Sequence, residues 1–167
     1  MDINDASFLD FWQTLNQYQV RYIFVGGFAT NFHGFQRFTG DVDIYLEDTL
    51  ENRQRMRKAY KAYIKIDFPS FETIQFVPGW VDFPLRDGTR LDIMTSMVGI
   101  DATFDECLTS AQIKEIDGIQ IPVLHIRQLI ENKKAVGREK DQIDVEKLEK
   151  IWALQQRNKG TEPLIPE

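Results

Sequence analysis

Three aspartates have the residue type and spacing that metal-dependent chemistry requires. Asp41 and Asp43 belong to an Asp-Val-Asp-Ile run at 41–44, and Asp92 is the centre of a Leu-Asp-Ile run at 91–93. Alternate side chains of a β-strand share a face, so Asp41 and Asp43 should project together, about 7 Å apart. If the strand of Asp92 lies beside theirs, Asp92 comes within about 5 Å of the pair. Three carboxylates this close would suit Mg²⁺ or Mn²⁺ better than Zn²⁺.

A glycine pair precedes the first two aspartates. Gly26 and Gly27 end the expected strand at 21–25, and thirteen residues separate them from Asp41. Each feature alone is common, because Asp-hydrophobe-Asp occurs on many half-exposed strands and a Gly-Gly after a strand often marks a turn or a helix-packing point. Their combination is far more specific.

The glycine pair, the 41–44 run and the later 91–93 run together resemble the signature of the polymerase-β-like nucleotidyltransferases. The chain is most similar to small prokaryotic members, the minimal nucleotidyltransferases and the abortive-infection toxin–antitoxin enzymes. The His-Gly pair at 33–34 and the Arg-x-Thr-x-Asp-x-Asp pattern at 37–43 fit this family, and 129–144 resembles its C-terminal helical element. The resemblance covers most of 21–148, with no recognised motif at 49–80.

The resemblance implies an α+β fold: a nucleotidyltransferase-like mixed β-sheet flanked by helices, mainly on one side, with C-terminal helices. It also implies transfer of a nucleoside monophosphate from an NTP, with ATP expected, to an acceptor hydroxyl, with Mg²⁺ or Mn²⁺ as cofactor. In such an enzyme Asp41 and Asp43 would bind both metals. Asp92 would hold the second metal and help to deprotonate the acceptor hydroxyl. Gly26 and Gly27, at a helix start, would let backbone N–H groups approach the triphosphate.

Two residues of the loop before Asp41 also match the family pattern. Arg37 could contact phosphate and Thr39 could orient Asp41; the alternative is a solvated arginine and a strand-edge threonine. His33, a lone histidine on a short helix, is expected to be structural.

The C-terminal helical element supplies further basic candidates. Lys133 and Lys140, together with Arg138, could reach the triphosphate or an acceptor. The alternative is that they form solvent-exposed ion pairs with Asp141 and Asp144, worth at most about 1 kcal/mol.

The elements that must position these residues follow from apolar spacing and turn signals. Helices are expected at about 8–18, 28–32, 49–64, 104–108, 126–136 and 139–156, the first capped by Asp5 or Ser7. Strands are expected at 21–25, at 41–46, and as two or three segments within 71–95, the last beginning at 90. A hairpin is expected at 113–121, turning at an Asp-Gly pair. A single domain over 1–157 and a flexible tail over 158–167 complete the prediction.

Composition narrows the functional class. The chain has 167 residues, 43% of them hydrophobic, and a net charge of −6 that disfavours binding nucleic acid through overall charge. No apolar run is long enough to cross a bilayer, and the acidic N-terminus does not resemble a secretory signal. One cysteine and two histidines make an internal disulfide impossible and a zinc site implausible. We expect a cytoplasmic protein that does not associate with a membrane.

One segment is strongly basic although the chain as a whole is acidic. Six basic residues and no acidic ones occur in 52–65, and three of them recur every four residues along one helix face. This ridge could bind RNA or an acidic partner protein; the alternative is an ordinary solvated helix face.

Three functions are consistent with these features. The first is a metal-dependent nucleotidyltransferase, acting on RNA, protein or a small molecule, in a toxin–antitoxin pair if the closer resemblance holds. The second is a catalytically idle nucleotidyltransferase fold that binds a partner toxin or antitoxin protein. The third, a metal-dependent nuclease, is poorer because it leaves the glycine pair unexplained.

Overall fold

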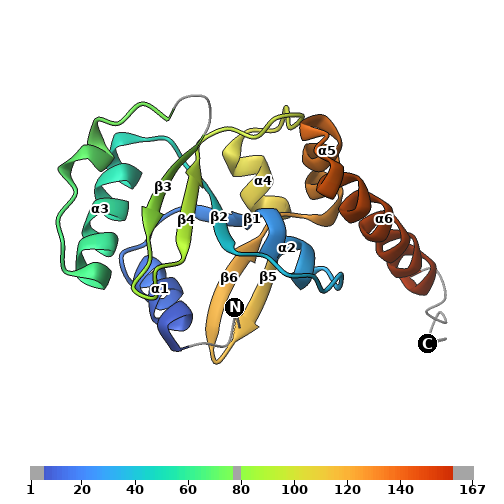
Figure 1. Ribbon diagram of the computed structural model, residues 1–167, viewed down its shortest axis with the longest axis horizontal. Helices are drawn as coiled ribbons and strands as arrows, with labels where there is room; N and C mark the ends of the chain where they lie inside the picture. The colour runs from blue at the N-terminus through green and yellow to red at the C-terminus, as the bar shows by residue number, and fades with distance from the viewer. Residues whose placement is uncertain (1–5, 77–79, 160–167) are drawn as a thin grey trace, which may run out of the picture.

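A mixed six-stranded β-sheet runs through the middle of the molecule (Figure 1). The computed structural model describes residues 6–76 and 80–159. The strand order is β3-β4-β2-β1-β6-β5. The strands are β1 (Tyr22–Val25), β2 (Asp41–Leu46), β3 (Trp80–Pro84), β4 (Arg90–Met94), β5 (Gln112–Ile116) and β6 (Ile119–Val123). The α+β class and the mixed sheet predicted from the sequence are confirmed.

Six α-helices and one short 3₁₀ helix surround the sheet within the described residues. They are α1 (Ala6–Gln17), α2 (Gly26–Phe32), α3 (Leu50–Ile64), η1 (Pro69–Glu72), α4 (Phe104–Ser110), α5 (Ile126–Val136) and α6 (Glu139–Lys159). Side-chain caps fix the residue at which two of these helices begin. The Thr49 side chain accepts a hydrogen bond from the Asn52 N–H at α3, and Thr103 and Glu106 form a capping box at α4. None of the described helices is both long and apolar enough to span a bilayer.

The register of the central strands fixes which side chains share a face. Strand β2 runs antiparallel to β1 and parallel to β4, and the register places Asp43 opposite Val25 on one side and Asp92 on the other. On β3, which is antiparallel to β4, Asp82 lies opposite Asp92. Since directly opposed residues point to the same side of a sheet, these positions form one row across four strands.

The opposite face of the sheet carries the aromatic core. Trp12 of α1 stacks on Tyr22 of β1, with ring centroids 5.5 Å apart, and meets Phe24 edge-on at 4.8 Å. Towards the other end of the sheet, Tyr60 of α3 packs edge-on against Phe83 of β3 at 5.5 Å. Helices α1 and α3 therefore cover the face away from the carboxylates and pack against each other.

The carboxylate face is covered only in part. Helix α4 packs over one end of β1 and β2, where Phe104 meets Tyr45 edge-on at 5.1 Å. The other end, where Asp41 and Asp43 lie, is left accessible beside α5. In Figure 1, α5 and α6 lie at the end of the molecule away from α3.

Several boundaries differ from the prediction. Helix α2 begins at Gly26 rather than at 28, so the glycine pair forms its first turn. The 71–95 segment gives two described strands, β3 and β4, after η1. Ser7 lies inside α1 and is not its cap, and Asp5 lies outside the described residues. Helix α6 continues to Lys159, two residues into the expected tail, whose residues 160–167 lie outside the described chain.

Candidate functional site

The three aspartates selected from the sequence lie on one face of the sheet. Asp41 and Asp43 alternate with buried residues along β2, and β4 pairs in register so that Asp92 stands directly opposite Asp43. Asp92 is buried, with 8% of its surface exposed, whereas Asp41 and Asp43 are half-buried. Asp82 of β3, which the sequence did not single out, extends the row as an exposed carboxylate.

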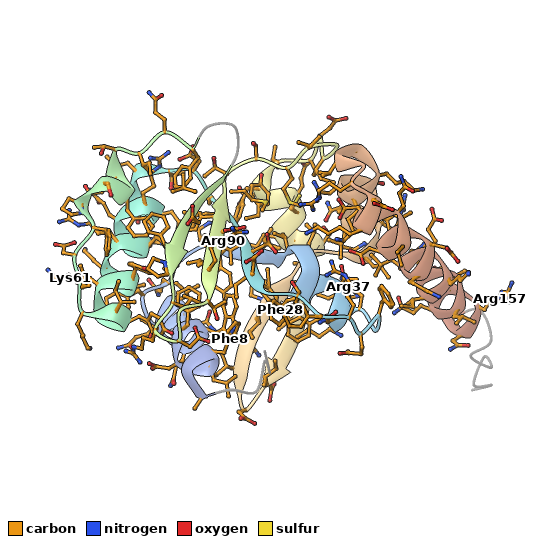
Figure 2. All side chains as sticks on the ribbon, in the orientation of Figure 1. Phe8, Phe28, Arg37, Lys61, Arg90 and Arg157 are labelled. Atoms are coloured by element: carbon orange, nitrogen blue, oxygen red, sulfur yellow. The ribbon has the colours of Figure 1, made fainter. Side chains whose placement is uncertain are left out.

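Arg90 bridges two of these carboxylates. Its Nη2 donates to Asp41 Oδ2 at 2.8 Å and to Asp92 Oδ2 at 3.2 Å, and its Nε lies 2.8 Å from Asp92 Oδ1. Arg90 stands two residues before Asp92 on the same strand, so both side chains project from one face. Figure 2 shows it over the middle of the sheet. The sequence reasoning missed this residue, although the alternation that selected the aspartates also places Arg90 beside them.

The carboxylates perturb one another. Burial and the charges of Asp92 and Asp41 together raise the pKa of Asp43 from its ordinary 3.8 to about 6, against a hydrogen bond from the Gly27 N–H and the charge of Lys133. Burial also raises the pKa of Asp92, opposed by the charge of Arg90. Like charges held together in a partly desolvated place need a cation to be stable when ionised.

The glycine pair allows the start of α2 to approach Asp43. Gly26 has φ +69°, and a Cβ at this position would overlap the Asp43 carboxylate. A Cβ at Gly27 would overlap the hydroxyl of Thr39 and lie 3.3 Å from an Arg37 nitrogen. The observed role of both glycines is therefore close packing: no side chain fits between α2 and the loop and strand that carry the aspartates.

The donor chemistry of this row fits a hard divalent cation. Its donors are carboxylate oxygens, and Asp92 Oδ1 is buried without a well-formed hydrogen bond, although Arg90 Nε is close. Across residues 6–76 and 80–159, however, no group of three or more His, Cys, Asp or Glu side chains is already arranged as a metal centre. Arg90 would have to release Asp41 and Asp92 for all three carboxylates to coordinate one cluster.

A cavity of about 300 Å³ opens beside the carboxylates. Asp43, Asp92 and Arg90 line one part of it, and Gly26 contributes backbone. The remaining lining comes from the end of β1, from the end of β4 with the chain that follows, and from the second half of α5 with the chain that follows: Val25, Met94, Ser96, Met97, Val98, Asn132, Lys133, Val136 and Arg138.

A buried ionic cluster lies behind this cavity. Asp144 of α6, with none of its side chain exposed, accepts two hydrogen bonds from Arg37, at 2.6 and 2.7 Å, and one from Lys133 at 2.7 Å. Asp141, equally buried, pairs with Arg138 at 2.6 Å and with Lys133 at 3.4 Å. Lys133 and Arg138 are partners as expected, whereas Lys140 pairs with neither aspartate, and both aspartate side chains are buried rather than solvent-exposed. The spacing of Asp141 and Asp144 puts both on the inner side of α6, against α5 and the loop of Arg37.

The remaining residues selected from the sequence do not line the cavity. Lys140 is exposed on α6 and is not among the described residues that line the cavity. His33 is buried and its Nε2–H donates to the Leu124 carbonyl at 2.8 Å, which is the structural role expected of it. Burial lowers the pKa of its imidazole. Thr39 packs against Gly27.

The basic ridge on α3 is largely neutralised by neighbouring acidic residues. Arg57 pairs with Asp67 at 2.7 Å and with Glu72 at 2.6 Å, and Lys61 also reaches Asp67 at 3.2 Å. Figure 2 places Lys61 at the end of the molecule away from Arg37. Arg57 and Lys61 of the ridge are therefore ion-paired, and neither lines the cavity beside the aspartates.

Comparison with known proteins bears on the fold. The sequence matches no protein-family model, and no curated protein is detectably similar to it in sequence. Among solved structures, the lincosamide antibiotic adenylyltransferase LnuA, bound to lincomycin, is similar, with a TM-score of 0.59 and 16% identity over 88% of this chain and 97% of that one. A provisionally assigned nucleotidyltransferase from Thermotoga maritima is similar with a TM-score of 0.54 and 15% identity over 91% and 90%. The chain therefore has a nucleotidyltransferase-like fold.

Proposed function

We propose that this chain is a metal-dependent nucleotidyltransferase that moves a nucleoside monophosphate from an NTP to an acceptor hydroxyl. The observation that carries the proposal is the register of β2 and β4, which sets Asp43 beside Asp92 with Asp41 on the same face. The close fit of Gly26 against Asp43 supports it, because that fit accounts for the glycine pair. Asp41, Asp43 and Asp92 would hold Mg²⁺ or Mn²⁺.

The reaction assigns a task to each group. The acceptor oxygen bonds to the α-phosphorus, the bond from that phosphorus to the bridging oxygen breaks, and pyrophosphate leaves. The hydroxyl proton passes to the Asp92 carboxylate, whose raised pKa suits it to act as a base. Lys133 and Arg138, which line the cavity, would attract the triphosphate. Bound divalent cations would neutralise the phosphate oxygens and align the attacking and leaving groups.

LnuA supports a first choice of substrates. It is an adenylyltransferase of a lincosamide antibiotic. ATP is therefore the first donor to test, and hydroxylated small molecules are the first acceptors, ahead of RNA and protein.

A second candidate function rests on Arg90. This arginine already neutralises Asp41 and Asp92 without a metal, which would suit a catalytically idle fold that binds a partner protein, such as one half of a toxin–antitoxin pair. The two candidates differ in whether the carboxylates bind divalent cations.

The deciding experiment measures transfer of label from α-³²P-ATP, with Mg²⁺ or Mn²⁺, to small-molecule, RNA and protein acceptors. Asp43→Asn should abolish transfer, and Asp101→Asn, which changes an exposed aspartate in the loop before α4, should leave it unchanged. In parallel, Mn²⁺ binding is measured by electron paramagnetic resonance. Absence of Mn²⁺ binding and of ATP binding at millimolar concentrations in the wild type would favour the idle fold.

A further inference from the structure

The loop after β4 and the end of α5 contribute apolar side chains to the cavity, beside the polar residues Ser96 and Asn132. Val98 and Val136, both large apolar side chains at its edge, are 63% and 39% exposed. Met97, next to Val98 in the chain, lines the same cavity. We call Met97, Val98 and Val136 the apolar wall. Exposed apolar side chains gathered at a cavity commonly mark a ligand or partner site.

The apolar wall is held in place by close packing. Gly99, with φ +78°, lets the loop after β4 lie directly on α5: a Cβ there would overlap that of Ala135 and stand 3.2 Å from the Glu131 carbonyl oxygen. Asn132 of α5 donates from Nδ2 to the Val98 carbonyl at 2.9 Å. These contacts bring Val98 to the same part of the cavity as Val136.

Cationic side chains lie directly beside the wall. Lys133 precedes Val136 by three residues on α5, so the two share a helix face, and Arg138 follows just after the helix. In the buried ionic cluster, Arg37, Lys133 and Arg138 carry three positive charges against the two negative charges of Asp141 and Asp144, which leaves a net charge of +1. The cavity thus combines a carboxylate part, a cationic part and an apolar part.

We propose that the apolar wall holds the base of the donor NTP, with the triphosphate directed towards Lys133 and Arg138. This inference rests on the proposed function and adds to it the site that receives the nucleoside. A nucleotide joins an anionic chain to a flat, largely apolar base, which is the combination that this cavity offers. With about 300 Å³, the cavity is at the lower end for ligand pockets and is open to solvent, so part of the nucleotide would lie outside it. The acceptor would then approach from the solvent-exposed side, near Asp82 and Arg90.

The test compares a ligand that has a base with one that lacks it. Isothermal titration calorimetry with Mg²⁺ measures binding of the α,β-methylene analogue of ATP, which cannot release pyrophosphate, and of inorganic tripolyphosphate. Val98→Ser/Val136→Ser should weaken binding of the ATP analogue about tenfold, since two partly exposed valines lose apolar contact, and leave tripolyphosphate binding unchanged. Ile143→Ser, at an exposed apolar position of α6 outside the cavity, should change neither.

A second variant guards against misfolding. Val98→Thr/Val136→Thr keeps the branched shape and should also weaken only the ATP analogue. If both double variants bind the ATP analogue as tightly as the wild type, the inference is wrong and the proposed function stands. If they bind it normally but lose affinity for an acceptor, the wall belongs to the acceptor. A wild type that binds neither probe overturns the proposed function, and the inference with it.

Discussion

At the scale of single residues, the negative charges of the neighbouring aspartates repel one another, and a bound cation would reduce this repulsion. The pKa of Asp43 is strongly raised, because its carboxyl group is desolvated and lies near the charges of Asp92 and Asp41. Its pKa of about 6 exceeds the ordinary 3.8, so between about pH 4 and pH 6 the folded protein retains a proton that the unfolded chain has lost. Ionising Asp43 therefore lowers the free energy of unfolding as pH rises through this window.

Asp43→Asn should accordingly stabilise the metal-free protein at pH 8, because the neutral amide avoids repulsion by Asp92. The gain should shrink as pH falls through about 6 and vanish near pH 4, where Asp43 of the wild type is itself neutral. Urea denaturation in EDTA at a series of pH values measures the difference. Asp101→Asn, the exposed control, should show no such pH-dependent gain. A variant that is less stable than the wild type at pH 8 would contradict the predicted repulsion.

At the scale of elements, Asp144 joins three segments of the fold. It connects α6 to Lys133 of α5 and to Arg37 of the loop before β2. Asp144→Asn would leave buried positive charge without its counter-charge, so the free energy of unfolding should fall by about 3 kcal/mol. Equilibrium urea denaturation at pH 7.5 measures this loss.

The matched control is Glu146→Gln, on the same helix two residues away. Glu146 pairs with Lys150 at 2.6 Å in an exposed i,i+4 pair, so its loss should change the free energy of unfolding far less. Equal effects of the two substitutions would show that the buried cluster adds no more stability than a surface pair.

The same elements show what the sequence could and could not predict. Alternation and turn residues were sufficient for β2 and for the β5–β6 hairpin, because these depend on local pattern. The pairing of Asp43 with Asp92 joins strands that are far apart in the sequence, so the sequence analysis could state it only as a condition. The alternation along β4 places Arg90 beside Asp92, but its bridge to Asp41 depends on the pairing of β4 with β2.

The burial of Asp144 depends on contacts with α5 and the loop of Arg37, which are far from α6 in the sequence. For this reason Asp144 was expected in solvent-exposed pairs, although its side chain is buried. The role of Lys140, which is exposed on α6, stays a prediction.

At the scale of the whole molecule, the C-terminal helices are part of the site and not an appendage. Helix α5 supplies Lys133 and Val136 to the cavity, and α6 holds Lys133 in place through its buried aspartates. On the opposite side of the sheet, α1 and α3 pack on an aromatic core that includes Trp12. The cavity can therefore keep its lining only while α5 and α6 stay packed against the loop of Arg37.

This interdependence predicts a single cooperative unfolding transition for the chain, as expected of one domain. Far-UV circular dichroism follows all helices, including the 21 residues of α6, whereas fluorescence of a Trp80→Phe/Trp152→Phe variant follows Trp12 in the core. Urea curves of that variant from the two signals should coincide in midpoint and slope, because the buried cluster ties α6 to the sheet through Arg37. An earlier transition seen only by circular dichroism would mean that the C-terminal helices unfold independently. In that case Lys133 and the apolar wall would be ordered only part of the time, and nucleotide binding would have to fold them.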